Sequence, residues 1–345
     1  MSRSIVHAGR YWLAACLGAL TLASCSGGVS VAQDPVGAPT PGQTIDSTAG
    51  DLEGNFIAVI NQVSPSVVVI QTEGGLGSGV VVDAHGNIVT NAHVVAGFST
   101  FRVLLPTGKS YNGNLVGTFV PDDLAVIHIS APELRPATFG DSDRLRVGSI
   151  AIAIGSPLGL QSSVTEGIVS ALGREVTEPN GVALPPLIQT STDINPGNSG
   201  GALADLRGEV IGIPTLAAQD PQVGGTAPGI GFAIPSNVAK DIASQLIQDG
   251  RVTNSHRAYL GVQVAALADG SGVAIYSLVP GGPAEDADLK VGDVISAIDG
   301  RVVSDQPALA SALSSLQPGR SIPVQVIRPD GSRVSVQVTL DVLPG

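Results

Sequence analysis

Short runs of alternating apolar and polar residues dominate the chain between residues 59 and 235. The stretch 79–89, for example, predicts two short strands around the polar turn 83–87. The run Leu-Ala-Val-Ile after Asp123 predicts a buried strand with a carboxylate at its head. Many short strands joined by tight turns predict a mainly β fold for this region.

The spacing of apolar residues changes just after this region. Val238 and Ile242, with the leucine and isoleucine that follow, recur at helical intervals and predict a helix over 236–249. Ser236 is a candidate N-cap, and Gly250 is a candidate C-terminal stop. We therefore expect a helical linker between the β-rich region and a second domain.

The N-terminal segment has the pattern of a targeting signal. Arg3 and Arg10 bracket a short positive region, and the apolar stretch 11–23 is too short to span a bilayer. Its end, Leu-Ala-Ser-Cys, resembles a bacterial lipobox with Cys25 as the first mature residue. We expect a signal peptide over 1–24 and a lipid on Cys25. Ordinary cleavage that releases a soluble protein is the alternative.

Residues 25–51 are mostly Gly, Ser, Pro, Thr, Ala and Gln, so they cannot bury a core and predict a flexible tether. Residues 51–63 predict a short helix that leads into the first strand. Cys16 lies in the predicted signal peptide, which leaves Cys25 as the one cysteine of the mature chain. No disulfide is expected, and lipidation would remove an otherwise lone exported thiol.

Composition narrows the function classes. The chain has 345 residues, room for about two domains, and its 44 glycines and 24 prolines fit many tight turns. Charged residues are 13%, the formal net charge is −12, and no Lys/Arg cluster is present, which argues against nucleic acid as a partner. The sequence shows neither a His/Cys cluster nor a phosphate-binding loop, so we expect no metal and no nucleotide cofactor.

The most informative stretch is Asn-Pro-Gly-Asn-Ser-Gly-Gly, which contains Ser199. Glycines on both sides let a substrate carbonyl approach the backbone closely. Such a turn can also aim successive backbone N–H groups at one point, as an oxyanion hole requires. A serine hydroxyl is a weak nucleophile alone, so this interpretation needs a base and an acid elsewhere in the chain.

Both partners are available upstream. His93 lies in Thr-Asn-Ala-His-Val-Val at a predicted strand end, and Asp123 heads a predicted buried strand. An acid placed there can hold a histidine tautomer and stabilise the imidazolium that forms when Ser199 gives up its proton. The order His, Asp, Ser is that of chymotrypsin-like enzymes.

Other candidates for these roles exist. Asp122, directly before Asp123, is the rival for the acid. The remaining histidines are interpreted as structural or solvated; they are His7, His85, His128 and His256.

The motifs around His93, Asp123 and Ser199 resemble, in order, the three catalytic motifs of the HtrA/Deg family. These are trypsin-like serine proteases with PDZ domains. The resemblance implies a protease domain over 52–235, made of two packed six-stranded antiparallel barrels with the active site in the cleft between them. It favours Asp123 over Asp122, since the family carboxylate directly precedes Leu-Ala-Val. It also implies an oxyanion hole at Gly197, Asn198 and Ser199.

The same resemblance does not decide which residue type the specificity pocket prefers. Ile194 would line an apolar pocket that favours cleavage after small aliphatic residues. Asp193, however, lies six residues before the nucleophile, where trypsins place the carboxylate that recognises Lys or Arg. We favour the aliphatic preference. The family also implies that the loop 173–186 senses the PDZ domain or its ligand and that the loop 214–228 shapes the specificity pocket.

Residues 258–345, after a linker over 236–257, resemble one PDZ domain (α+β). Tyr259, Leu260, Gly261 and Val262 match its carboxylate-binding loop, where backbone N–H groups hold a peptide C-terminus and the ligand adds a β-strand. A hairpin turn at Asp-Gly 299–300 and a helix over 306–316 beside the groove are expected.

The expected function is that of an exported serine endopeptidase of protein quality control and stress response, which degrades unfolded or damaged proteins. It would be a lipoprotein on the outer face of the bacterial cytoplasmic membrane, or else periplasmic or secreted. The family implies a homotrimer, with substrate C-termini read by the PDZ groove. The alternatives are a peptide-binding chaperone and a regulated protease that cuts one signalling substrate.

Overall fold

The computed structural model describes residues 47–155, 163–176, 184–195, 197–220 and 225–345. The predicted signal peptide and Cys25 lie outside the described residues, as does most of the predicted tether. None of the helices in the described ranges combines the length and the apolar character needed to cross a membrane.

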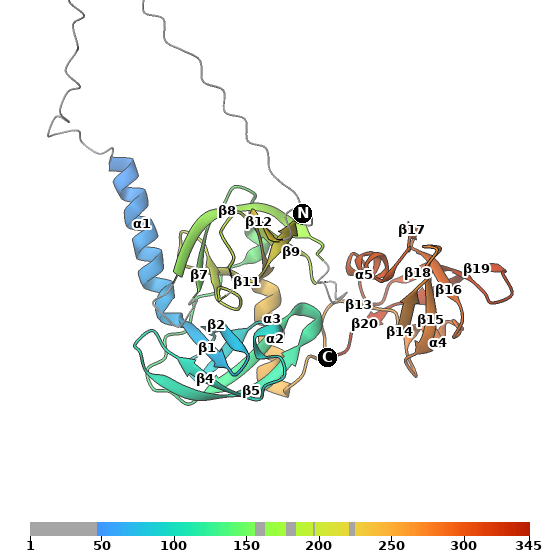
Figure 1. Cartoon of the computed structure of the whole chain (residues 1–345), viewed down its shortest axis with the longest axis horizontal. Helices are drawn as coiled ribbons and strands as arrows, with labels where there is room; N and C mark the ends of the chain where they lie inside the picture. The colour runs from blue at the N-terminus through green and yellow to red at the C-terminus, as the bar shows by residue number, and fades with distance from the viewer. Residues whose placement is uncertain (1–46, 156–162, 177–183, 196, 221–224) are drawn as a thin grey trace, which may run out of the picture. The chain divides into compact units, whose positions relative to one another are not determined.

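Six antiparallel strands close the first barrel, in the order β1-β2-β3-β6-β5-β4 (Figure 1). They are β1 (Val67–Thr72), β2 (Gly75–Val81), β3 (Asn87–Thr90), β4 (Thr100–Leu104), β5 (Ser110–Phe119) and β6 (Leu124–Ile129). The four-residue helix α2 (Ala92–Val95) follows β3, and the 3-10 turn η2 (Val120–Asp122) precedes β6. The barrel interior is filled by apolar side chains such as Ile70, Ile88 and Ile127, which are fully buried.

The second barrel has the same construction, in the order β10-β11-β12-β9-β8-β7. Its strands are β7 (Ile150–Gly155), β8 (Ser163–Arg174), β9 (Leu187–Thr190), β10 (Ala202–Ala204), β11 (Val210–Asp220) and β12 (Gly225–Pro235). In the chain, the 3-10 turn η3 (Ser142–Arg144) lies between the last strand of the first barrel and the first strand of the second. The mainly β, double-barrel fold expected from the sequence is confirmed.

One hydrophobic cluster joins the two barrels. Val80 and Leu124 of the first barrel pack in it with Ile154 and Ile213 of the second. Leu246 of helix α3 (Ser236–Asp249) belongs to the same cluster. Burying these side chains at the shared interface is what holds residues of both barrels in fixed relation to each other.

Helix α3 has the predicted bounds but a different N-terminus. Pro235 is the N-cap and makes no side-chain bond there, whereas the Ser236 hydroxyl donates to the Gly140 carbonyl at 2.9 Å. The prediction of Ser236 as N-cap was wrong because a tertiary acceptor takes its hydroxyl. Gly250 ends the helix, as predicted; it has the left-handed conformation, and its N–H donates to the Leu246 carbonyl.

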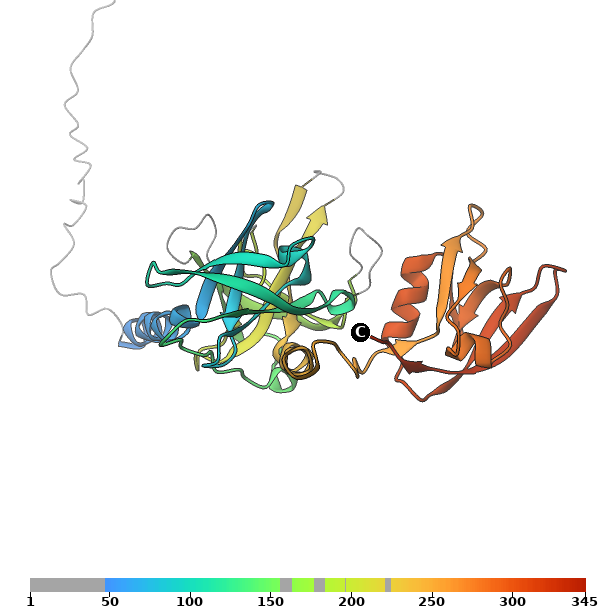
Figure 2. The ribbon, with the colours of Figure 1, turned by 90° about the horizontal axis from the view of Figure 1, so that it is seen from below.

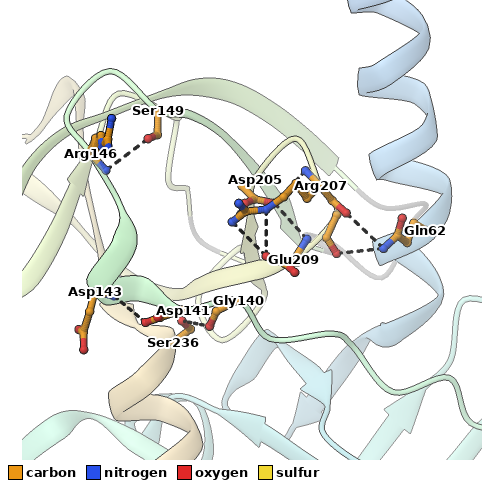
Figure 3. Close-up of polar contacts among 11 residues, drawn as sticks. Gln62, Gly140, Asp141, Asp143, Arg146, Ser149, Asp205, Arg207, Glu209 and Ser236 are labelled. Atoms are coloured by element: carbon orange, nitrogen blue, oxygen red, sulfur yellow. Dashed lines mark hydrogen bonds and ion pairs between the residues drawn. The ribbon is translucent and has the colours of Figure 1, made fainter.

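Helix α1 (Ser47–Val63) begins before the predicted 51–63 helix, and 3-10 turn η1 (Ser64–Ser66) leads from it into β1. Gln62 near its end donates to the Gly208 carbonyl at 3.3 Å, in the turn between β10 and β11 (Figure 3). In the same turn the Arg207 guanidinium pairs with Asp205 at 2.8 Å and Glu209 at 3.0 Å. The helix end is thus tied to the second barrel.

The C-terminal domain has its own core and is built on a six-stranded sheet with a helix alongside (Figure 2). The strand order is β14-β15-β16-β18-β19, and β17 pairs with β16 off this path. Its elements are β13 (Ala258–Tyr259), β14 (Val262–Ala266), β15 (Val273–Leu278), α4 (Pro283–Asp286), β16 (Val294–Ile298), β17 (Arg301–Val302), α5 (Gln306–Ser314), β18 (Ser321–Ile327), β19 (Arg333–Thr339) and β20 (Asp341–Val342). β14 begins the sheet path, and α5 ends two residues short of the prediction.

The predicted turn at Asp299 and Gly300 is confirmed. Ile298 pairs with Arg301, and both turn residues have positive φ, 48° and 79°. A two-residue hairpin with left-handed central residues has the twist that flanking strands require, which explains the Asp-Gly sequence.

Candidate active site

His93 lies in α2, one turn after β3, and not at the strand end itself. Its Nδ1 lies 2.8 Å from Oδ2 and 3.0 Å from Oδ1 of Asp123. A carboxylate accepts only, so Nδ1 carries the proton, and in the neutral ring Nε2 is then the basic nitrogen. The side chain is 47% exposed, which leaves the imidazole accessible to a substrate.

Asp123 is held at both its side chain and its backbone. It has φ 51°, a left-handed conformation that aspartate tolerates better than most residues, and it is 3% exposed. Its carboxylate accepts from the His93 N–H at 3.0 Å and from the Thr215 hydroxyl. Its carbonyl accepts from Asn91 Nδ2 at 3.0 Å and from the Ala92 N–H at 3.1 Å. The carboxylate orientation is therefore fixed before any substrate binds.

The neighbouring Asp122 does not contact His93. It is fully buried, and its Oδ1 lies 2.7 Å from Nη1 of Arg257. Burial removes water from this carboxyl and raises its pKa, against the lowering effect of the Arg257 charge. The two adjacent carboxylates thus have different partners: Asp122 pairs with Arg257, and Asp123 contacts the His93 imidazole.

The other described histidines lie away from this group. His85 is exposed, at 3.9 Å from Asp83, and the ring of His128 contacts the His85 carbonyl at 3.0 Å. His256 lies 3.6 Å from Asp241. His7 lies outside the described residues.

Ser199 lies on a turn between β9 and β10, and it is half-buried. Its hydroxyl donates to the Thr215 carbonyl at 3.1 Å. Gly197 and Gly200 on either side have φ of 104° and 81°, values that an L side chain rarely adopts. The glycine pattern of the motif is thus required by the backbone of this turn.

Two backbone N–H donors of this turn have no acceptor within the described part of the chain. Among the hydrogen bonds of the described residues, none uses the N–H of Gly197 or of Ser199. Asn198 lies between them, 1% exposed, with its own N–H bonded to the Asn195 carbonyl at 2.9 Å and its side chain to the Asp193 carbonyl at 3.2 Å. Such a pair of unpaired donors beside a hydroxyl can bind an oxyanion.

Thr215 is a site residue that the sequence interpretation missed. It is 3% exposed and connects Asp123, through its hydroxyl, with Ser199, through its carbonyl. No motif marks it, and β11 is buried without a break from Val210 to Thr215, so its burial pattern does not single out Thr215 either. The segment 214–228, expected to be a loop, mostly continues β11 and β12, because these strands pair as far as Asp220 and Gly225. Residues 221–224 lie outside the described residues.

A cavity of about 600 Å³ opens beside His93 and Ser199. Apolar side chains line it on two sides: Ile194, Leu216 and Ala217 from the second barrel, and Leu76, Val94 and Phe98 from the first. A peptide laid across Ser199 would therefore contact apolar surface on both sides of the scissile bond.

Ile194 and Asp193 differ in their relation to this cavity. Ile194 is 6% exposed and lines it, and a Cβ on Gly231 would lie 2.5 Å from its Cγ1. Asp193 is exposed and does not line it, and its carbonyl accepts from Thr165 at 3.0 Å. Among the described residues, no carboxylate lines this cavity, which favours the apolar preference.

The loop expected to bind a peptide carboxylate connects β13 to β14. Gly261 has φ 76°, and its carbonyl accepts from the Val279 N–H at 2.9 Å. Leu260 is 1% exposed, and its carbonyl accepts from the Ala284 N–H at 3.0 Å. These bonds fix the loop backbone through its carbonyls. Tyr259 is partly buried, which raises the pKa of its phenol.

The expected loop 173–186 begins later than predicted, because β8 continues to Arg174. Residues 177–183 of this loop lie outside the described residues. Within its described part, the Glu175 carboxylate accepts from the Ser311 hydroxyl of α5 at 2.5 Å.

Comparisons with known proteins agree with this architecture. The family model of the trypsin-like peptidase domain matches residues 77–213, and that of the PDZ domain matches residues 258–340. The chain is similar to a probable periplasmic serine endoprotease, DegP-like, of Chlamydia trachomatis, at 41% identity over 78% of this chain and 54% of that protein. It is also similar to the serine protease PepD of Mycobacterium tuberculosis, at 36% identity over 94% of this chain and 77% of that protein.

Solved structures give the same result. The HtrA-type protease AlgW with a decapeptide matches with a TM-score of 0.60 and 32% identity, over 84% of this chain and 99% of that one. A serine endoprotease from Yersinia pestis matches with a TM-score of 0.58 and 32% identity, over 84% of this chain and 98% of that one. The chain spans about half the length of the DegP-like relatives that it matches.

Proposed function

Because this chain belongs to the HtrA family of serine proteases, we propose that it is an endopeptidase that cleaves unfolded or damaged proteins by attack of Ser199. The observation that carries the proposal is the convergence of three residues from two barrels. Asp123 holds Nδ1 of His93 at 2.8 Å, and both His93 and Ser199 line one cavity.

The mechanism follows from the placement of protons. His93, with its proton on Nδ1, takes the Ser199 proton at Nε2 while the oxygen attacks the substrate carbonyl. The imidazolium that forms is stabilised by Asp123, and His93 then protonates the leaving amine. The acyl-enzyme is hydrolysed by water, which His93 activates in the same way.

The charge that develops on the carbonyl oxygen needs donors that are already in place. The N–H groups of Gly197 and Ser199 supply them in this proposal, with Asn198 between them. Donors that are unpaired in the free enzyme stabilise the transition state without first breaking another bond. The buried, bonded position of Asn198 supports a fixed oxyanion hole.

The PDZ domain supports recognition of substrate C-termini. Tyr259, Leu260, Gly261 and Val262 run from the end of β13 into the first residue of β14, where the sheet path begins. An extended peptide can add to such an edge by backbone hydrogen bonds, with its carboxylate at the loop. We further propose export of the chain, a lipid on Cys25 that tethers it to the membrane, and a homotrimer as the working unit.

The test is casein hydrolysis by the chain without residues 1–24, with Ser199→Ala as the control. Mass spectrometry of the products identifies the cut sites. We expect cleavage after small aliphatic residues and none with Ser199→Ala. Equal hydrolysis by both proteins would contradict the serine mechanism, and cuts after Lys or Arg would contradict the apolar pocket.

One observation favours a second candidate, a protease that is silent until a ligand engages it. A hydroxyl has a single proton, and in this structure the Ser199 hydroxyl uses it to donate a hydrogen bond to the Thr215 carbonyl. The hydroxyl must rotate to face His93 before it can react. If casein is cut only when a C-terminal peptide is added, this regulated function is favoured. If Ser199→Ala still suppresses aggregation of an unfolded client and the wild type never cuts, a chaperone is favoured.

A further inference from the structure

Ser78 links the first barrel directly to the turn 197–200, which carries Ser199 and is called the nucleophile turn below. It lies in β2, is fully buried, and is not part of any catalytic motif. Its hydroxyl donates to the Gly197 carbonyl at 2.5 Å, and its N–H donates to the Ser199 carbonyl at 2.9 Å. One residue of the first barrel thus holds two carbonyls of a turn that belongs to the second.

The first of these bonds fixes the central peptide of the turn. That peptide joins Gly197 to Asn198: its carbonyl accepts from Ser78, and its N–H donates to Asn195 at 2.9 Å. The unpaired N–H groups of Gly197 and Ser199 lie on either side of it. Rotation of this peptide would break both bonds and leave buried polar groups unpaired, which is unfavourable.

Ser78 is itself held in place. Its carbonyl accepts from the Thr90 hydroxyl at 2.7 Å, and Thr90 is also fully buried. A Cβ on Gly200 would lie 2.2 Å from the Ser78 carbonyl oxygen and 2.4 Å from Thr90 Oγ1. The turn therefore packs closely against the Ser78 backbone, which fixes the position from which the hydroxyl reaches the Gly197 carbonyl.

We propose that Ser78 is a positioning residue for the oxyanion hole. It touches no substrate and acts by holding the Gly197–Asn198 peptide, so that the flanking N–H groups face the developing oxyanion. The proposal rests on the function proposed above. Because the effect is on transition-state stabilisation, it predicts a loss in kcat with little change in KM.

The test compares Ser78→Ala with Ser236→Ala. Ser236 is a matched control, since it is also fully buried and its hydroxyl donates to a backbone carbonyl, that of Gly140 (Figure 3). Ser236 does not line the cavity beside Ser199. We expect Ser78→Ala to lower kcat about 10- to 100-fold with KM within about twofold, less than loss of a direct oxyanion donor. Ser236→Ala should leave both constants within about twofold.

A second readout separates positioning from loss of stability. A peptide boronate with alanine at its reactive end needs the oxyanion hole, whereas the matching product peptide does not. Ser78→Ala should weaken binding of the boronate by about the factor lost in kcat and leave binding of the product peptide unchanged. Equal losses for both ligands, or none for the boronate, would overturn the proposal.

Ser78→Cys keeps nearly the same volume and replaces a strong donor with a weak one. It should have intermediate kcat, and it carries the test if Ser78→Ala does not fold. An active wild type, an inactive Ser199→Ala and a Ser78→Cys indistinguishable from wild type would overturn this inference alone. A wild type that hydrolyses no peptide or protein, with or without a C-terminal peptide, would instead contradict the proposed function.

Discussion

The two barrels have the same strand order but present different chemistry at the same place. Read from its first strand, each barrel runs 1-2-3-6-5-4. The connection after the third strand carries His93 in one barrel and Ser199 in the other. In the first barrel this connection is a short helix; in the second it is a glycine-rich turn with two positive φ angles.

This difference shows that the topology sets where the two connections lie, whereas the local sequence sets which chemical groups they present. The repeated topology brings the equivalent connections to the interface that both barrels share. The residues in each connection then decide what faces the cavity. A helix N-terminal turn orients a side chain, whereas a glycine turn exposes backbone donors and a hydroxyl. The proposed base, His93, and the proposed nucleophile, Ser199, therefore come from equivalent positions.

The largest effect is expected from the two adjacent aspartates of the first barrel. Asp123→Asn should lower kcat/KM about 10⁴-fold, because the amide no longer fixes the His93 tautomer. Asp122→Asn should change it less than about threefold, since Asp122 faces Arg257. Steady-state hydrolysis of a fluorogenic peptide measures both. Similar losses in the two variants would show that the structure assigns the acid wrongly.

The next largest effect is expected from replacing one glycine in each of the two connections, Gly200 in the second barrel and Gly97 in the first, by alanine. A Cβ at Gly200 would collide with Ser78, whereas one at Gly97, with φ 83°, would meet nothing within 4 Å. Gly200→Ala should lower the free energy of unfolding by more than about 3 kcal/mol and abolish activity. Gly97→Ala should cost only the left-handed backbone, about 1–2 kcal/mol.

Chemical denaturation followed by circular dichroism measures these changes, with activity assayed in parallel. If both alanine variants lose the same stability, the packing of the nucleophile turn against the first barrel is not what requires Gly200.

A smaller effect is expected in the pH dependence of stability. Burial raises the pKa of Asp122 above its ordinary value of 3.8, so the folded state binds this proton more tightly than the unfolded chain does. The contribution of Asp122 to the free energy of unfolding is then greatest at low pH. It falls as the pH rises from 3.8 through the raised pKa.

Asp122→Asn removes this titration, so its stability relative to wild type should increase as the pH rises from about 4 to 7. The unfolding midpoints of both proteins across this range measure the difference. A relative stability of the variant that decreases with pH would mean that the Arg257 charge outweighs the burial of Asp122.

The smallest effect is expected at the specificity pocket. Asp193→Asn should leave kcat/KM within about twofold for peptides with Ala or Val before the scissile bond, because Asp193 does not line the cavity. Ile194→Ala should enlarge the cavity and shift the preference towards larger apolar residues. A set of peptides that differ only at that position measures both. If the wild type cleaves after Lys or Arg and Asp193→Asn loses that cleavage, the basic preference is favoured instead.

The sequence alone determined the elements that short motifs and local turn chemistry specify. The motifs predicted His93 and Ser199 as site residues, and both line one cavity. The φ of 104° at Gly197 accounts for a glycine that the motif contains. The Asp-Gly hairpin turn was likewise predictable, because its two residues suit the left-handed conformation without help from the rest of the fold. These features depend on interactions between residues close together in the chain.

The tertiary structure decided what depends on residues far apart. Thr215 lies 92 residues from Asp123, and Ser78 lies 119 residues from Gly197, so no local pattern signals either hydrogen bond. For the same reason Ser236 looked like a helix cap until Gly140 proved to be its acceptor. A buried polar group takes whichever partner the packed core brings to it, and only the assembled barrels determine which partner that is.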